Sequence, residues 1–325
     1  MTEDARTRFI GARNREEQCF ADDTGQIVCP DGVGRRDTPL DFTGDLSLGE
    51  NQFATRGSFF GQRGSANSDV WRVISGTFNI TRNDDGATSA LISGRVAWEH
   101  NQSEDTLLAY YIGGDVSRSE IEDNFNGTAT GYSLSLGSYF VTELRDDLFA
   151  DGYASLGYGV TQLEMSNDTL GLDGEHRGLS FQTGASVTGV YEKGAIEFWP
   201  QLAADYGYSS IGTVDFDAEA FGLVDNVSLD GGDVSIFKVS FEPEIKVAIS
   251  GDVEGFASTT FTVTPRRSCQ RTSGTTTQED CGGGAGINLS TRSDDDLGRF
   301  DAGISVERIG DSTQASAQLK LERRF

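Results

Sequence analysis

The feature that most constrains this chain is a strict alternation of apolar and polar residues over 234–249. One face carries the apolar side chains, which are Phe237, Val239, Phe241, Pro243, Ile245, Val247 and Ile249. The other face carries Lys238, Ser240, Glu242, Glu244 and Lys246. Successive side chains of a β-strand point to opposite sides, so a strand with one apolar and one polar surface has this pattern. The segment is therefore expected to be a two-sided β-strand.

The same alternation recurs from residue 69 to the end of the chain. It predicts twelve strands at about 69–80, 87–100, 105–117, 128–141, 147–163, 178–191, 194–208, 233–250, 252–265, 282–291, 298–309 and 312–325. Most of these segments reach the roughly 9–11 residues that a tilted strand needs to cross a bilayer. An even number of antiparallel strands closes into a barrel with both ends on one side. Closure is expected between 69–80 and 312–325.

The composition favours a membrane β-barrel over other classes. Only 36% of the residues are apolar, glycine is 41 of 325, and the formal net charge is −25. No apolar run approaches the roughly 18–20 residues of a membrane helix. A strongly acidic chain is a poor nucleic-acid binder, because binding to phosphates needs a basic face. A barrel strand needs an apolar residue only at every second position, so low apolar content is compatible with it.

The lengths of the connections follow the parity of the predicted strands. Short connections follow even-numbered strands, at Asn101–Asp105, Thr142–Asp146, Glu192–Lys193, Gly251 and Thr291–Leu297. Long connections follow odd-numbered strands, at Ser117–Gly127, Glu164–Arg177, Ser209–Gly232 and Arg266–Cys281, although Thr81–Gly86 and Gly310–Asp311 are short. Bacterial outer-membrane barrels have short periplasmic turns and longer external loops. We expect both termini to be periplasmic and the long loops to face outward.

In this arrangement the polar face of 234–249 lines the barrel interior. Lys238, Glu242, Glu244 and Lys246 are therefore predicted lumen-facing charges. They are expected to stabilise a polar interior and not to carry catalysis. Residues 1–68 are predicted to be a separate N-terminal region, with a helix within 1–18 followed by a polar, glycine-rich linker or plug at 19–68. Residues 69–325 are predicted to form the barrel.

The four cysteines form two local pairs, Cys19 with Cys29 and Cys269 with Cys281. Neither spacing is that of a CxxC zinc or redox motif. Two small polar loops, each closed by two cysteines, indicate disulfides in an oxidising compartment, with free thiols as the alternative. The second pair is expected to cap an external loop.

Catalytic chemistry is not evident in the sequence. The two histidines, His100 and His176, lie outside any recognisable nucleophile motif. The acidic turns at Asp84–Asp85 and Asp294–Asp296 do not have the spacing of an EF-hand calcium loop. The chain is therefore predicted to be no enzyme and to need no cofactor or metal.

Several segments, in order, resemble the β-domain of the autotransporters, the type V secretion family of Gram-negative outer membranes. They are SDVWRVISGTFNI with SALISGRVAWEH, DTLLAYYIGGDVSRSE, ATGYSLSLGSYF, DDLFADGYASLGYG, IEFWPQLAADYGY and the closing RFDAGISVERIGDSTQASAQLKLERRF. The resemblance covers about residues 69–325. It departs from the family at the end of the chain, where Arg323 stands in place of an apolar residue and the usual glycine is missing.

The resemblance implies an outer-membrane translocator that exports or anchors an upstream passenger. It implies that the terminal strand, with Leu319, Leu321 and Phe325 in register, is an assembly signal read by the barrel assembly machinery. It also implies that the 4–18 helix threads the pore, where acidic lumen residues would hold its arginines, because charges in a narrow pore are poorly screened. The alternatives are a standalone channel or structural surface barrel, a soluble secreted acidic β-protein and, last, an outer-membrane enzyme.

Overall fold

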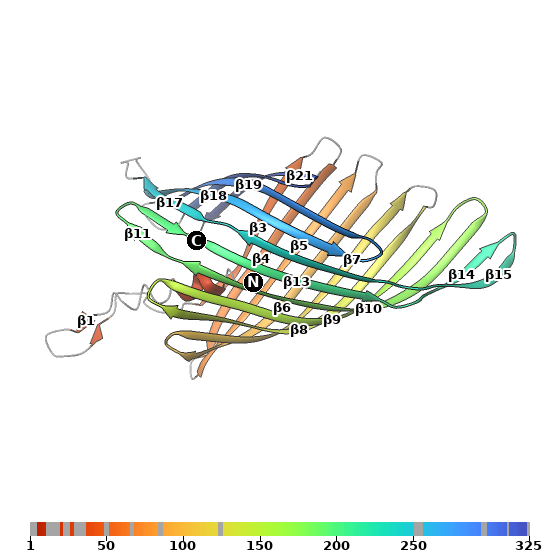
Figure 1. The fold of residues 1–325 in the computed structure, drawn as a ribbon, viewed down its shortest axis with the longest axis horizontal. Helices are drawn as coiled ribbons and strands as arrows, with labels where there is room; N and C mark the ends of the chain where they lie inside the picture. Colours follow the sequence, from red (N-terminus) through yellow and green to blue (C-terminus); the bar gives the residue numbers. More distant parts are fainter. Residues whose placement is uncertain are drawn as a thin grey trace.

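The chain folds into a closed antiparallel β-barrel (Figure 1). The computed structural model describes residues 5–10, 20–21, 27–28, 37–48, 52–65, 68–83, 87–122, 126–249, 256–293, 298–310 and 312–323. Apart from one helical turn at 5–10 and the small β1–β2 pair (Phe20–Ala21 and Ile27–Val28), nearly all of them belong to the barrel sheet or its turns. No described helix is long and apolar enough to cross a membrane.

The first half of the barrel is a meander of long strands, each paired with the next along the chain. These strands are β3 (Thr38–Leu48), β4 (Gln52–Ser65), β5 (Ser68–Asn83), β6 (Thr88–Ser103), β7 (Thr106–Glu122), β8 (Asn126–Arg145), β9 (Leu148–Ser166) and β10 (Leu170–Gly189). In Figure 1 they run from orange to green.

The second half contains interrupted strands and one projecting hairpin. Its elements are β11 (Tyr191–Lys193), β12 (Ile196–Trp199), β13 (Gln201–Ile211), β14 (Val214–Ala220), β15 (Leu223–Leu229), β16 (Asp233–Phe241), β17 (Glu244–Ile249), β18 (Phe256–Ser273), β19 (Thr277–Ser293), β20 (Gly298–Ile309) and β21 (Ser312–Arg323). β11 continues β10, while β12 with β13 and β16 with β17 each act as one strand. Counted in this way, and with the β14–β15 hairpin set aside, the described residues give fourteen spanning strands.

The expected count of twelve strands is therefore wrong, although each of the twelve predicted segments overlaps a strand. The two additional strands, β3 and β4, lie within residues 38–65, which were expected to be a linker. The barrel thus begins near residue 38 and not at 69. The sequences of these strands are rich in glycine and polar residues, and β4 contains the adjacent Phe59 and Phe60, so clean alternation is lost. Backbone pairing with neighbouring strands makes them strands despite this weak pattern.

The position of barrel closure is corrected for the same reason. β5 pairs with β4, and the terminal strand β21 pairs with β3 instead of with 69–80. This closing seam is short, with Ala317 opposite Leu46 and Gln318 opposite Asp45. The neighbouring β20–β21 pair, in contrast, is in register from Gly298–Arg323 to Ile309–Ser312. The seam is the least extensively paired junction between spanning strands that the described residues make.

Apolar side chains form a continuous band on the outer surface. The register places six residues side by side across neighbouring strands: Ile74, Val96, Ile112, Leu136, Leu156 and Phe181. Tyr206 and Phe237, which lie opposite each other, continue the row diagonally, because the ring centroids of Phe181 and Tyr206 are 6.4 Å apart. Leu136 and Leu156 at the centre of this row are 58% and 66% exposed. Exposed apolar rows of this kind suit a lipid environment, and barrel closure satisfies the backbone groups that lipid cannot.

The two ends of the barrel differ in their connections. One end has two-residue turns at 104–105, 146–147 and 194–195. At the other end β9–β10, β14–β15 and β18–β19 form long hairpins, so the predicted loops at 164–177, 209–232 and 266–281 are mostly strand. Continued pairing satisfies backbone groups that an open loop would leave to solvent. The sorting of long and short connections to opposite ends agrees with the prediction.

Two prolines interrupt neighbouring strands at the same level. Pro200 separates β12 from β13, and Pro243 separates β16 from β17. The register places Trp199 opposite Glu244 and Leu202 opposite Phe241, so the two interruptions face each other. Proline has no N–H to donate to a ladder, which explains both breaks.

Glycines in the wall make room for aromatic rings that lie across them. A side chain at Gly137 would clash with the ring of Tyr111, and one at Gly184 would clash with Tyr153. Both tyrosines line the same lumen cavity. The high glycine content is thus partly explained by the need for close approach between strands and inward aromatic rings.

Candidate functional site: the plugged lumen

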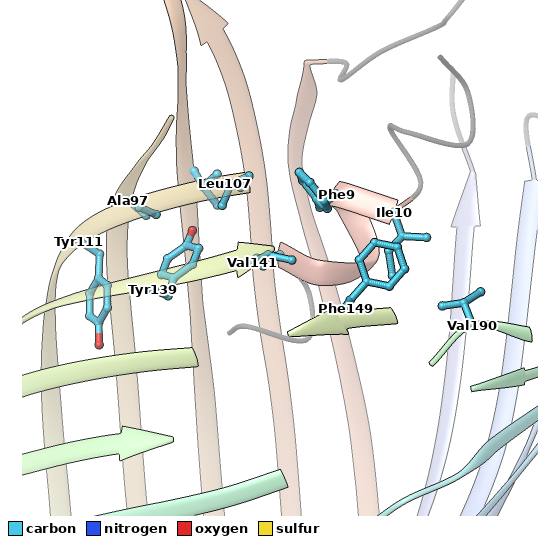
Figure 2. Close-up of a cluster of buried hydrophobic side chains, with 12 residues drawn as sticks. Phe9, Ile10, Ala97, Leu107, Tyr111, Tyr139, Val141, Phe149 and Val190 are labelled. Atoms are coloured by element: carbon cyan, nitrogen blue, oxygen red, sulfur yellow. The ribbon is translucent and has the colours of Figure 1, made fainter. Parts of the chain in front are cut away.

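The helical residues 5–10 lie inside the barrel, packed against inward side chains of the wall (Figure 2). Ala5, Arg6, Phe9 and Ile10 are 0%, 3%, 8% and 2% exposed. The spacing of Ala5, Phe9 and Ile10 gives a short helix an apolar face. The wall residues that complete the cluster are Val73, Ala97, Leu107, Ala109, Tyr111, Tyr139, Val141, Phe149 and Val190. We call residues 5–10 the plug helix.

Arg6 binds three polar side chains on three neighbouring parts of the wall. Its Nη1 donates to Asp151 Oδ2 at 2.7 Å and to Ser186 Oγ at 3.0 Å. Its Nη2 donates to Gln201 Oε1 at 3.3 Å. Ser186 Oγ in turn donates to Asp151 Oδ2 at 2.6 Å. Arg6 and Asp151 are both almost completely buried, so neither charge relies on bulk water for compensation.

Arg8 makes a second ionic contact on the other side of the plug helix. Its Nη2 donates to Glu99 Oε1 at 2.6 Å, and Glu99 is 0% exposed. Tyr139 also donates its hydroxyl to Glu99. The Arg8 guanidinium lies 4.8 Å from the centre of the Phe60 ring, within the range of a cation–π contact. Two arginines two positions apart thus bind acids on two different strands, β6 and β9.

Apolar packing supplements the ion pairs. The ring of Phe9 meets that of Phe149 edge to face, with centroids 6.5 Å apart and an interplanar angle of 79°. Figure 2 shows Phe9 and Ile10 beside Phe149 and Val141 near the barrel wall. Phe149 is the second residue after the short turn at 146–147, whereas Asp151 lies two residues deeper along the same strand. The plug helix therefore runs from the interior, at Arg6, toward the mouth with the short turns, at Phe9.

Three of the four predicted lumen charges, Lys238, Glu242 and Glu244, line cavities beside the plug helix. A cavity of about 280 Å³ is bounded by Arg6, Thr188 and Trp199 together with Glu242 and Glu244. A second, of about 380 Å³, is bounded by Asp151 and Asp205 together with Lys238 and Glu242. The space left beside the plug helix is therefore polar.

Three of the four predicted charges have oppositely charged neighbours. Lys246 Nζ lies 3.3 Å from Glu244 Oε2 and 3.7 Å from the centre of the Trp199 ring. Glu242 Oε2 lies 2.9 Å from Arg266 Nε. The Lys246–Trp199 contact joins β17 to β12, and the Glu242–Arg266 contact joins the break between β16 and β17 to β18.

The cysteine pairs have different outcomes. Cys269 and Cys281 form a disulfide with an S–S distance of 2.05 Å and a Cα–Cα distance of 4.0 Å. It joins directly opposed residues of β18 and β19, so it crosslinks a paired hairpin and does not cap an open loop. Cys19 and Cys29 lie outside the described residues, so their disulfide remains a prediction.

The proposed assembly signal is only partly described. Leu319 lies opposite Ala302 and Leu321 opposite Phe300 along β20–β21, while Phe325 lies outside the described residues. The spacing of the two leucines matches the alternation of the neighbouring strand. Their part in assembly remains a prediction.

Sequence reasoning missed the individual residues that bind the plug helix. It expected an acidic lumen but did not single out Glu99, Asp151 or Tyr139. A local signal does exist for the two acids, because each directly follows an outward-facing aromatic or apolar residue. Glu99 follows Trp98 in AWEH, and Asp151 follows Ala150 in LFADG. Such acids occur at many inward positions, so only the fold distinguishes these two from the others.

The fold and the lumen together define a plugged β-barrel with an apolar outer surface. No protein-family model matches the chain, and no curated protein matches it. Among solved structures it is similar to the β-domain of the Bordetella autotransporter BrkA, at 12% identity over 87% of this chain and 100% of that one, with a TM-score of 0.49.

Two further structures show a similar level of likeness. The translocator domain of the autotransporter NalP from Neisseria meningitidis is 14% identical over 99% of this chain and 98% of that one, with a TM-score of 0.46. BauA, the ferric preacinetobactin receptor of Acinetobacter baumannii, is 13% identical over 91% of this chain and 53% of that one, with a TM-score of 0.45. Likeness at this level concerns the general fold alone, so the function must be argued from the residues of this chain.

Proposed function

We propose that this chain is an outer-membrane translocator barrel that carries or anchors a polypeptide joined to its N-terminus. The observation that carries the proposal is the plug helix, a part of the same chain that occupies the lumen and is bound there by Arg6–Asp151 and Arg8–Glu99. A barrel that holds its own N-terminal segment inside the pore keeps that segment on a path across the membrane.

The direction of the plug helix supports this proposal. Because Arg6 lies deeper in the lumen than Phe9, the N-terminal end of the plug helix points away from the mouth with the short turns. Short turns are typical of the periplasmic side of such barrels. A segment joined upstream would therefore be directed toward the outer surface.

The outer face and the C-terminal strand complete the proposal. The apolar band would contact outer-membrane lipid, and the barrel assembly machinery would recognise the terminal strand through Leu319, Leu321 and Phe325. Neither function requires a catalytic group, a metal or a cofactor.

The test is surface display. The full chain is expressed behind a signal peptide, with an epitope tag between that peptide and residue 1, and intact cells are probed with antibody and external protease. We expect the tag to be detected on the surface and the unboiled protein to migrate faster than the boiled one, as a closed barrel does. A folded barrel whose tag is never surface-exposed would overturn the proposal and favour a standalone channel. Solubility without detergent would overturn the membrane barrel itself.

A further inference from the structure

The β14–β15 hairpin projects beyond the rest of the barrel at the end with the long connections, at the far right in Figure 1. β14 pairs with β10 along 170–175 and with β15 along its whole length. β15 pairs with β14 only, so no described strand covers its other edge. An exposed strand edge presents unpaired N–H and C=O groups that can template another strand.

The open edge of β15 lies in line with the edge of β16 that pairs with β18. β16, which follows β15, pairs with β18 up to Ser235 opposite Ser273. β18 then turns back at 274–276 into β19. Beyond this turn, no described strand lies beside β15. A strand added there would extend the sheet in line with β18.

Apart from the charge of Asp225, this edge lacks the features that usually protect an exposed strand. All seven residues of β15 are exposed, and Leu223 and Val224 are 76% and 70% exposed. The adjoining turn residue Phe221 is 89% exposed. β15 contains no lysine or proline, and its register with β14 has no bulge. Natural edge strands commonly carry such features to prevent unwanted pairing.

The two faces of the hairpin differ in chemistry. Asp215, Asp217 and Glu219 lie on one face, opposite Ser228, Asn226 and Val224. The other face carries mainly apolar side chains, which are Val214, Phe216, Ala218, Ala220, Leu223, Val227 and Leu229. Residues 214–233 contain six acidic residues, at 215, 217, 219, 225, 230 and 233, and no lysine or arginine.

We propose that the open edge of β15 is a docking site for an extended, basic polypeptide segment that adds to the hairpin as a further strand. Main-chain hydrogen bonds would supply affinity, as in other cases of β-strand addition. Alternate side chains would supply specificity, with basic residues beside the acidic face and apolar residues beside the other. A second copy of this chain is disfavoured as the occupant, because two acidic hairpins repel. The inference does not depend on translocation.

The direct test measures binding of labelled peptides to the full chain, folded in detergent, by fluorescence anisotropy. The probe is an octapeptide of alternating lysine and valine. One control replaces lysine with glutamate. The other replaces valine with proline, which keeps the charge but removes half of the N–H donors. We expect only the lysine–valine peptide to bind.

Two variants locate the binding. Asn226→Pro removes an N–H that bonds to the Asp225 side chain at 2.9 Å and not to β14, so the hairpin ladder is retained. It should weaken binding about tenfold or more. Asp217→Asn with Glu219→Gln should weaken binding of the lysine–valine peptide as well, as expected for lost charge. The matched control is Glu279→Gln, an exposed acid on β19 of the neighbouring hairpin, which should leave binding unchanged.

Several outcomes would overturn the proposal. They are equal affinity for Asn226→Pro, equal binding of the lysine–proline peptide, and no binding of the lysine–valine peptide. Dimerisation of the free protein that Asn226→Pro abolishes would assign the edge to a second copy instead. Unchanged heat-modifiable migration of each variant shows that the barrel itself is intact.

Discussion

Arg6 and Asp151, 145 positions apart in the sequence, meet inside the barrel with Nη1 2.7 Å from Oδ2. The pair joins the plug helix to strand β9, and both side chains are almost fully buried. Removing one partner of a buried ion pair leaves an uncompensated charge and typically costs about 3–5 kcal/mol. This loss of free energy weakens the docking of the plug helix and not the barrel, because the strands of the wall pair with one another without it.

Asp151→Asn should therefore release the plug helix without unfolding the barrel. We expect larger and more frequent open-channel currents in planar bilayers than for the unmodified protein. The control is Glu175→Gln, which removes an exposed acid that bonds to Arg177 on β10 and should leave the currents unchanged. Identical currents for Asp151→Asn and the unmodified protein would show that the pair does not retain the plug helix.

Phe9→Ala should loosen the same helix by removing apolar contact. A buried phenylalanine truncated to alanine typically costs about 3–5 kcal/mol, and Phe9 loses its edge-to-face contact with Phe149. Hydrogen exchange of residues 5–10 should accelerate strongly. Phe221→Ala, at a position that is 89% exposed, should have no such effect. Slow exchange in Phe9→Ala would mean that the ion pairs alone hold the helix.

The closing seam can be tested with paired cysteines. Leu46→Cys with Ala317→Cys places two thiols at directly opposed positions of β3 and β21, so a disulfide should form on mild oxidation. The comparison is Ile80→Cys with Ala317→Cys, which tests closure between β5 and β21 and should remain reduced. Mass spectrometry of tryptic fragments identifies the linked peptides. A crosslink in the second variant and none in the first would restore the twelve-stranded closure.

Loss of the Cys269–Cys281 disulfide should weaken one hairpin and leave the barrel intact. The bond closes a short segment, with a sequence separation of 12, and the entropic model gives such a loop about 3 kcal/mol. In Cys269→Ser with Cys281→Ser, trypsin should cut faster at the exposed Arg271. Gel migration of the unboiled protein should not change. A barrel that no longer resists detergent at room temperature would show that the disulfide has a wider role.

The alternation of residues by itself determined the class of fold and located most strands. Side-chain direction along a strand is a local property, so the pattern at Phe237–Ile249 could be recognised without any knowledge of its neighbours. The sorting of short and long connections was local in the same way. β3 and β4 were not predicted because their residues alternate poorly, and backbone pairing with the strands beside them decides their structure.

The tertiary structure alone decided which distant residues meet. The sequence indicated that arginines near the N-terminus could be held by acids in the lumen, but only the folded barrel selects Asp151 for Arg6 and Glu99 for Arg8. It also placed the closing seam at Leu46 and Ala317 and left the edge of β15 open. Barrel closure and docking of the plug helix depend on the register of the strands around the whole barrel. This register is set by contacts between residues far apart in the sequence, so no local pattern of residues predicts it.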